Sequence, residues 1–162
     1  MNDYPMDSTA AGFMETLKKM GDDLKADMET IVNNVVERTF ESILDQSPYD
    51  KGRYVASHRI SKGSERTDSF TGDFGTPRKS EASRQAGIAY SKQEAEGFRW
   101  DLADDSVWFS NHVDPHHQWV ETGWPHLVSD KATTKEGYLV YHLAEQRMEK
   151  EYIPKEVKKA GY

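Results

Sequence analysis

The sequence predicts an α+β protein in which a small antiparallel sheet is packed by a long N-terminal helix and a C-terminal helix, with one long polar loop. Three observations support this prediction. They are an apolar stripe at helical spacing over residues 9–45, two short strand-like segments at 53–60 and 106–111, and a second helical pattern over 137–151.

The first predicted helix runs from Thr9 to Asp45, and its apolar side chains recur in steps of mostly three and four. About 37 residues at 1.5 Å each make a rod of roughly 55 Å, well beyond an ordinary globular helix. We expect a continuous or kinked helix; the alternative is a break at Gly21, with Asp22 or Asp23 capping a second helix. The stripe either covers the chain's own sheet, the more common arrangement, or meets a partner surface.

The middle of the chain predicts a strand, a loop and a helix in turn. Residues 53–60 alternate, with Tyr54, Ala56, His58 and Ile60 on one face, as is typical of a strand. Residues 61–80 are rich in Gly, Ser and Thr with two Phe as anchors, which predicts a long mobile loop, either a solvated excursion or a segment ordered by assembly. A helix is expected from Ser83 to Ala95.

The second half closes the fold. Residues 106–111, "SVWFSN", predict a strand, and residues 113–136 an irregular region. The final helix, residues 137–151, is expected to bury Leu139 and Leu143, with Tyr138, Tyr141 and Met148 as further candidates. Pro154 ends that helix or starts a brief final turn.

A chain of 162 residues can bury one sizeable core but not two. We therefore expect one domain over residues 9–152, including the loop at 61–80, with a flexible segment at 1–8 and a tail at 153–162. The chain has no cysteine, which excludes disulfides and thiolate zinc sites. No apolar run approaches the roughly 18 residues of a membrane span, and the N-terminus does not resemble a signal peptide, so we expect a soluble, cytoplasmically made protein without membrane contact.

The net charge of −7 is unevenly distributed. Residues 1–52 carry 5 Lys/Arg against 11 Asp/Glu and residues 100–132 carry 1 against 6, whereas residues 53–99 carry 9 against 6. A chain this acidic is a poor candidate for binding duplex DNA, because that binding depends on Lys and Arg side chains that neutralise the DNA phosphates. Nucleotide-binding loops, serine-hydrolase elbows and zinc-helix motifs are all missing from the sequence, so we expect no cofactor and no enzymatic activity.

Histidines cluster in "HVDPHHQWVETGWP", residues 112–125, where His112, His116 and Glu121 are candidate metal ligands. The spacing disfavours a site, since adjacent His116 and His117 point apart and Pro115 forces an extended or turn conformation. We therefore expect no metal. A small histidine-dependent metalloenzyme remains the alternative from a different class of function.

Two segments carry a resemblance. The first contributes Pro48, Asp50, Gly52, Arg53, Ala56 and Ser57, and the second Val107, Trp108, Asn111, Pro115, Trp119, Val120, Glu121, Gly123 and Trp124. In this order, separated by a loop and a short helix, they resemble the tail-completion or neck protein family of tailed bacteriophages over about residues 9–125. The chain departs from the family at Lys51, at His116-His117 and in the stretch after Trp124.

The motif residues also have local physical interpretations. Asp50 is expected to accept backbone N–H groups and so fix a turn, and Asn111 to bond the backbone where a strand ends. Glu121 and Arg53 are a candidate ion pair joining the two segments. Gly123 would permit a tight bend, and Trp124 would anchor it.

The resemblance implies a virion structural protein rather than an enzyme, located in the tail or neck and assembled in the host cytoplasm. It implies a ring, expected to contain six copies, that completes or terminates the tail tube and contacts the tail tube protein and the head-connector or adaptor proteins. DNA would pass through the lumen without specific binding, and an acidic lumen would let it slide. A head-closure or adaptor ring of another neck layer is the alternative within this class.

Overall fold

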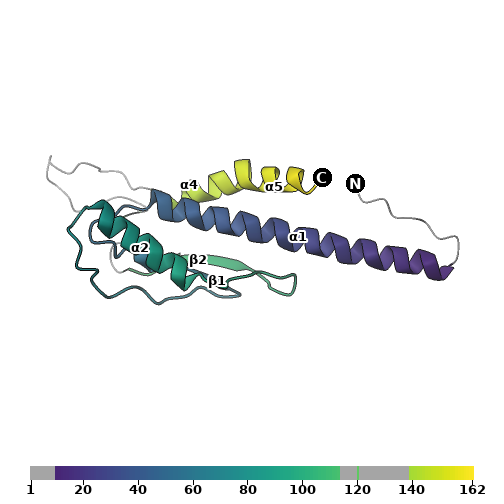
Figure 1. Cartoon of the computed structure of the whole chain (residues 1–162), viewed down its shortest axis with the longest axis horizontal. Coiled ribbons are helices and arrows are strands. Elements are labelled where there is room, and N and C mark those ends of the chain that lie inside the picture. The colour runs from purple at the N-terminus through teal and green to yellow at the C-terminus, as the bar shows by residue number, and fades with distance from the viewer. Residues whose placement is uncertain (1–9, 114–119, 121–138) are drawn as a thin grey trace.

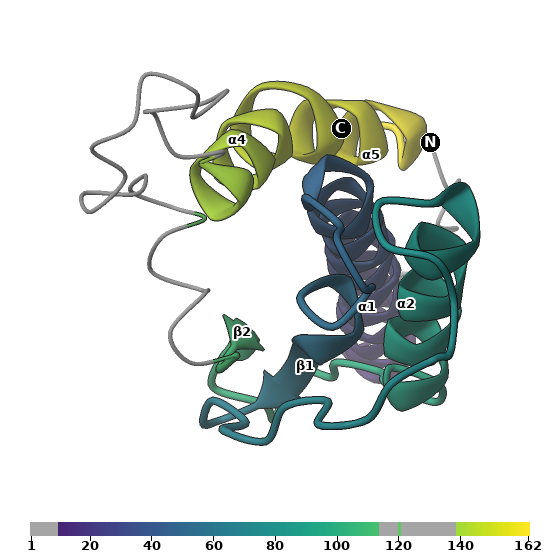
Figure 2. The same ribbon diagram turned by 90° about the vertical axis from the view of Figure 1, so that its left-hand side faces the viewer.

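The computed structural model describes residues 10–113, 120 and 139–162. It is α+β, with a long N-terminal helix and a two-stranded antiparallel sheet, so the predicted fold class is confirmed. The long helix, α1 (Ala10–Gln46), lies between two layers: the C-terminal helices along one side, and helix α2 (Glu81–Glu94) with the sheet along the other (Figures 1 and 2). The segment predicted to be flexible, residues 1–8, lies outside the described residues.

Helix α1 is unbroken at Gly21, so the continuous helix is confirmed and the alternative of a second helix starting after Gly21 is wrong. Its second half carries the core. Val36, Phe40 and Leu44 pack with Val55 and Ile60. A neighbouring cluster joins Ile43 to Tyr54, Val120, Val140 and Ala144. Among the described residues, the stripe therefore covers the chain's own elements along its second half only.

The sheet consists of β1 (His58–Lys62) and β2 (Val107–Asn111), in the register His58 to Asn111 and Lys62 to Val107. The predicted strand at 53–60 is therefore wrong at both ends. Residues Val55–Ser57 form a 3-10 turn, in which the Ala56 N–H donates to the Gly52 carbonyl over 2.9 Å. Every residue from Tyr54 to Ile60 is buried, because the turn and the strand are covered on both sides. Alternation of apolar and polar residues was therefore a misleading guide to this segment.

Helix α2 begins directly after the loop, two residues before the predicted start at Ser83, and Ser80 caps it by accepting the Ser83 N–H over 3.1 Å. The residues between β1 and α2, 63–80, contain no helix or strand, as expected of an extended loop.

The C-terminal layer is one nearly continuous run: α4 (Val140–Arg147), a π-helical turn (Met148–Tyr152) and α5 (Ile153–Lys159). Of the two roles expected for Pro154, ending the helix is wrong, whereas starting a brief final turn fits α5. Residues 153–159 of the segment expected to be a tail are helical. Pro154 falls in the first turn of α5, where a proline has no helical N–H bond to lose, and the wide π turn before it accommodates the ring.

The buried side of α4 is one residue out of phase with the prediction. Val140 and Ala144 are buried, whereas Leu139 and Leu143 are exposed and Tyr141 is half-buried. The small Ala144 side chain lets α4 approach α1 closely, an effect of packing rather than of hydrophobicity. Tyr138 lies outside the described residues. Within the described part of the chain, no helix combines the length and apolar character needed to cross a bilayer.

Candidate functional site

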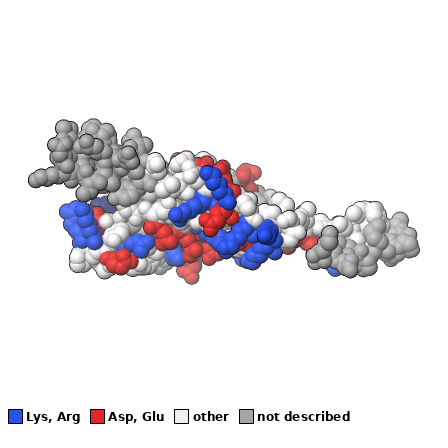
Figure 3. Space-filling view, turned by 90° about the horizontal axis from the view of Figure 1, so that it is seen from above, with Lys and Arg blue, Asp and Glu red and all other residues white. Residues whose placement is uncertain are grey.

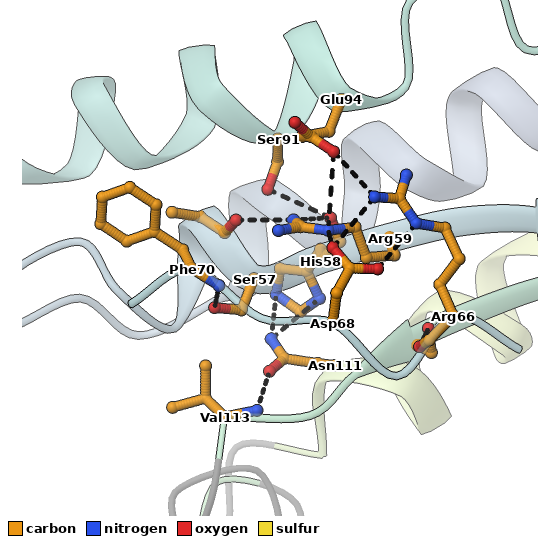
Figure 4. A network of polar contacts seen from close by, with 12 residues as sticks. Ser57, His58, Arg59, Arg66, Asp68, Phe70, Ser91, Glu94, Asn111 and Val113 are labelled. Atoms are coloured by element: carbon orange, nitrogen blue, oxygen red, sulfur yellow. Dashed lines mark hydrogen bonds and ion pairs between the residues drawn. The ribbon is translucent and has the colours of Figure 1, made fainter. Parts of the chain in front are cut away.

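The two motif segments meet at a buried polar centre around His58 (Figure 4). The Asn111 side-chain amide donates to the carbonyl of Tyr54 over 2.9 Å and lies 3.3 Å from His58 Nδ1. Its oxygen accepts the backbone N–H of Val113 over 3.1 Å. Asn111 therefore bonds the backbone where β2 ends, as predicted, and it also ties that end to the first motif segment.

The hydrogen bonds around His58 determine which ring nitrogen carries the proton. The single hydroxyl proton of Ser47 goes to the Ile43 carbonyl, 2.7 Å away, so His58 Nε2, also 2.7 Å from Ser47 Oγ, must be the donor. Nδ1 then accepts from the Tyr141 hydroxyl over 2.9 Å. Complete burial, and secondarily the charge of Arg59, lowers the pKa of His58 to about 3. The neutral ring thus links the end of α1, the start of β1 and helix α4.

Arg59, the next residue, lies on the other side of the strand and is only 2% exposed. Its guanidinium donates to the carbonyls of Ala56 and His58, and its Nε donates to Asp68 over 2.7 Å. Glu94 on α2 lies 3.9 Å away. A buried arginine needs such partners, because an unpaired charge in this position would be costly.

Asp68 makes this centre the attachment point of the loop 63–80. Arg66 donates to both Asp68 oxygens and reaches Glu94 over 2.8 Å. Hydrogen bonds from Arg66 and then Arg59 lower the pKa of Asp68 to about 2. The loop is further anchored by the stacked rings of Phe70 and Phe74, 4.5 Å apart, which pack against Tyr90 on α2.

Ser57 joins the loop to the first motif segment. Its hydroxyl donates to the Arg53 carbonyl over 2.7 Å and accepts the backbone N–H of Phe70 over 3.0 Å. The predicted loop is therefore bound to its own domain through polar and aromatic contacts.

Helix α2 packs on the turn through a face of small residues, Ser83, Gly87 and Ser91. A Cβ on Gly87 would lie 2.6 Å from the Gly52 carbonyl oxygen, and one on Gly52, whose φ is +78°, would clash with the backbone carbonyl oxygen of Ser83. Ser91 Oγ donates to the Val55 carbonyl over 2.6 Å. Gly52 is thus required both by its backbone conformation and by the approach of the helix.

The role predicted for the Asp50 carboxylate is not the one observed. That carboxylate pairs with Arg78, with a shortest distance of 2.6 Å, and this pairing lowers its pKa. The Asp50 main-chain carbonyl, not the side chain, makes the backbone contact, accepting the Lys79 N–H over 2.6 Å. Because Arg78 comes from the far end of the loop, this partner is not evident from local sequence.

The remaining predicted residues are placed unevenly. Pro48 is half-buried just after α1, Ala56 is buried, and Arg53 is exposed. Five of the motif residues fall outside the described part of the chain: Pro115, Trp119, Glu121, Gly123 and Trp124. The Arg53–Glu121 pair is therefore not placed.

Of the three candidate metal ligands, only His112 is among the described residues. Its Nε2 lies 3.3 Å from a carboxylate oxygen of Glu65. Within the described ranges, no three His, Asp or Glu side chains gather in a way that would hold a metal ion. His116 and Glu121 lie outside those ranges.

Sequence reasoning missed the residues that organise this centre: His58 as a polar link, Arg59, Asp68 and Tyr141. The only local signal was the pair of phenylalanines in the otherwise polar loop, which indicated that the loop packs on something. The charged partners come from β1, the loop and α2, and their meeting depends on the tertiary fold.

A second feature lies at the other end of α1, where its first half extends beyond the rest of the fold (Figure 1). We call the apolar side chains of this part the α1 stripe: Phe13, Met14, Leu17, Met20, Leu24 and Met28. Between 42% and 64% of each side chain is exposed. On the face seen in Figure 3, acidic and basic side chains are interspersed over the body of the molecule, without a patch of a single sign.

A groove of about 510 Å³ lies between α1 and the C-terminal end of α2. Val36, Phe40, Ile60, Ala95 and Phe98 provide its apolar lining. These residues belong to the main core or pack against it, so the groove opens directly onto the core.

Comparison with known proteins identifies no relative: no protein-family model, no curated protein and no solved structure matches this chain.

Proposed function

We propose that this chain is a structural protein of the virion, the subunit of a homo-oligomeric ring in the neck of a tailed bacteriophage. The ring, expected to contain six copies, would complete or terminate the tail tube, join it to the head-connector or adaptor proteins, and leave a channel for DNA. The assignment to phage rests on the resemblance of the two motif segments.

The observation that supports an assembly role best is the α1 stripe. Six large apolar side chains at roughly half exposure leave on the order of 500 Å² of apolar surface uncovered, the size of the largest apolar patch on a typical monomer, and such patches are often functional. The helix that carries it is 37 residues long, and among the described residues only its second half packs against the core. A surface of this kind is suited to contact with another protein.

The buried polar centre around His58 and Arg59 also supports an assembly role, because it makes the domain rigid. His58 is neutral and fully hydrogen-bonded, and Arg59 is neutralised by carboxylates of the loop and α2. These groups hold together the 3-10 turn, the loop and α2, which makes a rigid body suitable for building into an assembly.

The test is the mass and shape of the purified full chain. Size-exclusion chromatography with light scattering and negative-stain microscopy should show closed rings, and an antibody against the chain should label the neck of mature particles. A subunit that remains monomeric at tens of micromolar and is missing from mature particles would overturn the proposal. Labelling of the head side of the neck instead would assign the chain to a head-closure or adaptor layer.

A further inference from the structure

We propose that the α1 stripe is the contact between two copies of this chain, whose projecting half-helices pack antiparallel, stripe against stripe. A two-fold contact uses the same surface of both copies, so it joins them in pairs and does not by itself close a ring. The inference therefore goes beyond the proposed ring and does not rest on it. It specifies a second copy of this chain as the partner that covers the stripe.

The first argument is that the stripe continues an interface already present within the chain. Met20 precedes Arg38 by 18 residues, which is five full turns, so both project from the same side of α1. Arg38 lies 3.2 Å from the Glu156 carboxylate of α5. Leu17 precedes Val35 by the same 18 residues, and Val35 is buried. The stripe is thus the uncovered continuation of the face on which the C-terminal helices pack (Figure 1).

The C-terminal layer ends at about the level of Asp27, where the Tyr162 hydroxyl donates to the Asp27 carboxylate over 3.2 Å. From there to Ala10, no helix of the described part of the chain lies on this face of α1. These 17 or so residues make roughly 25 Å of helix. Because the same face receives helices along its second half, another helix of this length is the occupant that extends the existing packing.

The space around the stripe selects the antiparallel direction. In a parallel pair, both copies of α1 would continue side by side beyond Met28, where each carries its own C-terminal layer on the paired face. Two such layers do not fit between helices whose axes lie about 8–10 Å apart. In an antiparallel pair, the free end of each α1 reaches the partner's C-terminal end, and each body lies beyond the partner's free end.

The spacing of the stripe lets it pair with itself in a single register. With the two-fold axis beside Met20, Leu17 lies opposite the partner's Leu24. The same axis places Phe13 opposite the partner's Met28. Large apolar side chains therefore meet large apolar side chains along the whole contact, and a surface that matches its own copy in this way is what a two-fold contact requires.

The charged side chains lie on the flanks of the stripe. At 100° per residue, Lys18 and Lys25 project about 90–110° from its centre. The two-fold axis brings Lys18 to the same flank as the partner's Lys25. Each lysine has an acidic residue four positions further along its own helix, Asp22 or Glu29, which offsets part of the repulsion. Added salt should therefore tighten the pair, because it screens the repulsion that is left.

The area is sufficient for a reversible pair. Each stripe exposes on the order of 500 Å² of apolar surface, so two copies bury on the order of 1,000 Å² of it together. Specific interfaces bury about 1,200–2,000 Å² in total, and the flanking side chains bring the contact to the lower end of that range. We therefore expect a dissociation constant on the order of micromolar.

The first experiment determines direction and register by cross-linking the full chain, which contains no cysteine of its own. Met20→Cys places a thiol beside the axis and should form a disulfide-linked dimer under mild oxidation. Met28→Cys is the matched control, since its two copies would lie about 22 Å apart along the helices and should cross-link at least about tenfold more slowly. Mixing Phe13→Cys with Met28→Cys should give a dimer that contains one of each, as measured by mass spectrometry.

The second experiment tests the apolar contact without any cross-link. Leu24→Glu should raise the dissociation constant of the pair at least about tenfold in sedimentation velocity, because it places a charge in the centre of the stripe. Ala26→Glu is the matched control, since it adds the same charge to an exposed position on the opposite side of the same helix. It should pair as the unchanged chain does. Far-UV circular dichroism establishes that each variant is folded.

The outcomes separate this inference from the proposed function. Equal self-cross-linking of Met20→Cys and Met28→Cys would overturn the antiparallel direction. Rings or pairs that form normally with Leu24→Glu would overturn the stripe as the contact and leave the ring in place. Pairs that form as expected without any closed ring would support the contact and count against the ring. A chain that is monomeric at tens of micromolar would overturn both.

Discussion

Replacing Gly87 by alanine should destabilise the protein, although the same change at an ordinary position within a helix stabilises it. Gly87 lies in the middle of α2, where its hydrogen atom faces the turn that precedes β1. An added Cβ would lie 2.6 Å from the Gly52 carbonyl oxygen and 3.0 Å from Val55 Cβ. Neither neighbour is the end of a flexible side chain: the first is backbone and the second belongs to a completely buried residue.

The magnitude follows from two opposed effects. Alanine in place of glycine within a helix contributes up to about 1 kcal/mol through backbone conformational entropy. Forcing an additional methyl group into a close-packed contact costs about 1–3 kcal/mol, because α2 must move away from the turn. The net expectation is a loss of up to about 2 kcal/mol in the free energy of unfolding, equivalent to a decrease in Tm of up to about 6 °C for a chain of this size.

Gly21→Ala is the matched control, since a Cβ at Gly21 meets nothing within 4 Å. It should raise the free energy of unfolding by up to about 1 kcal/mol. Urea unfolding followed by circular dichroism, at one low protein concentration for both variants, measures the difference. If Gly87→Ala stabilised the chain as Gly21→Ala is expected to do, the close approach of α2 to the turn would be wrong.

Three further predictions concern the polar contacts. Folding lowers the pKa of His58 from 6.5 to about 3, so between these pH values the unfolded chain binds a proton that the folded chain does not. The free energy of unfolding should therefore fall as pH falls below 6.5, by up to about 2 kcal/mol between pH 7 and 5. His58→Gln should remove this part of the pH dependence in urea titrations, and an unchanged dependence of stability on pH would contradict a neutral buried ring. Asp68→Asn removes the charged partner of buried Arg59 and should lower the free energy of unfolding by about 1–3 kcal/mol. The amides of residues 66–74 should also exchange faster. Exchange no faster than in the original chain would mean that the loop is held by its aromatic rings alone. Glu156→Gln weakens the contacts of α5 with Arg38 and Asn34 on α1. The amides of residues 153–159 should therefore exchange faster, while those of β1 do not change. Equally faster exchange in α5 and β1 would show that the substitution destabilises the whole fold.

The long helix, the α+β class and the position of α2 could be predicted from sequence because they depend on periodicity and capping, which are local. The start of β1 could not. Val55 and Ala56 are buried within a 3-10 turn, and a turn covered on both sides has the same apolar content as a strand. The buried side of α4 was missed for a related reason: Ala144 is preferred at the contact because it is small, whereas hydrophobicity alone favours Leu143.

The polar centre was predictable only in part. Asn111 was identified because asparagine at the end of a strand has a local role. Arg59 and Asp68 are nine residues apart, and Glu94 and Tyr141 are further away still, so nothing local indicates that they meet. The same applies to Asp50, whose partner Arg78 is brought to it by the loop.

The two halves of α1 should differ in how they melt. Starting a helix is the unfavourable step, whereas extending one adds a hydrogen bond for each residue fixed. The packed half holds the starting turns in place, so the projecting half needs only extension from them, and its own order is lost gradually from the free end. A thermal scan of dilute protein should therefore show a shallow loss of helical ellipticity before the main cooperative transition.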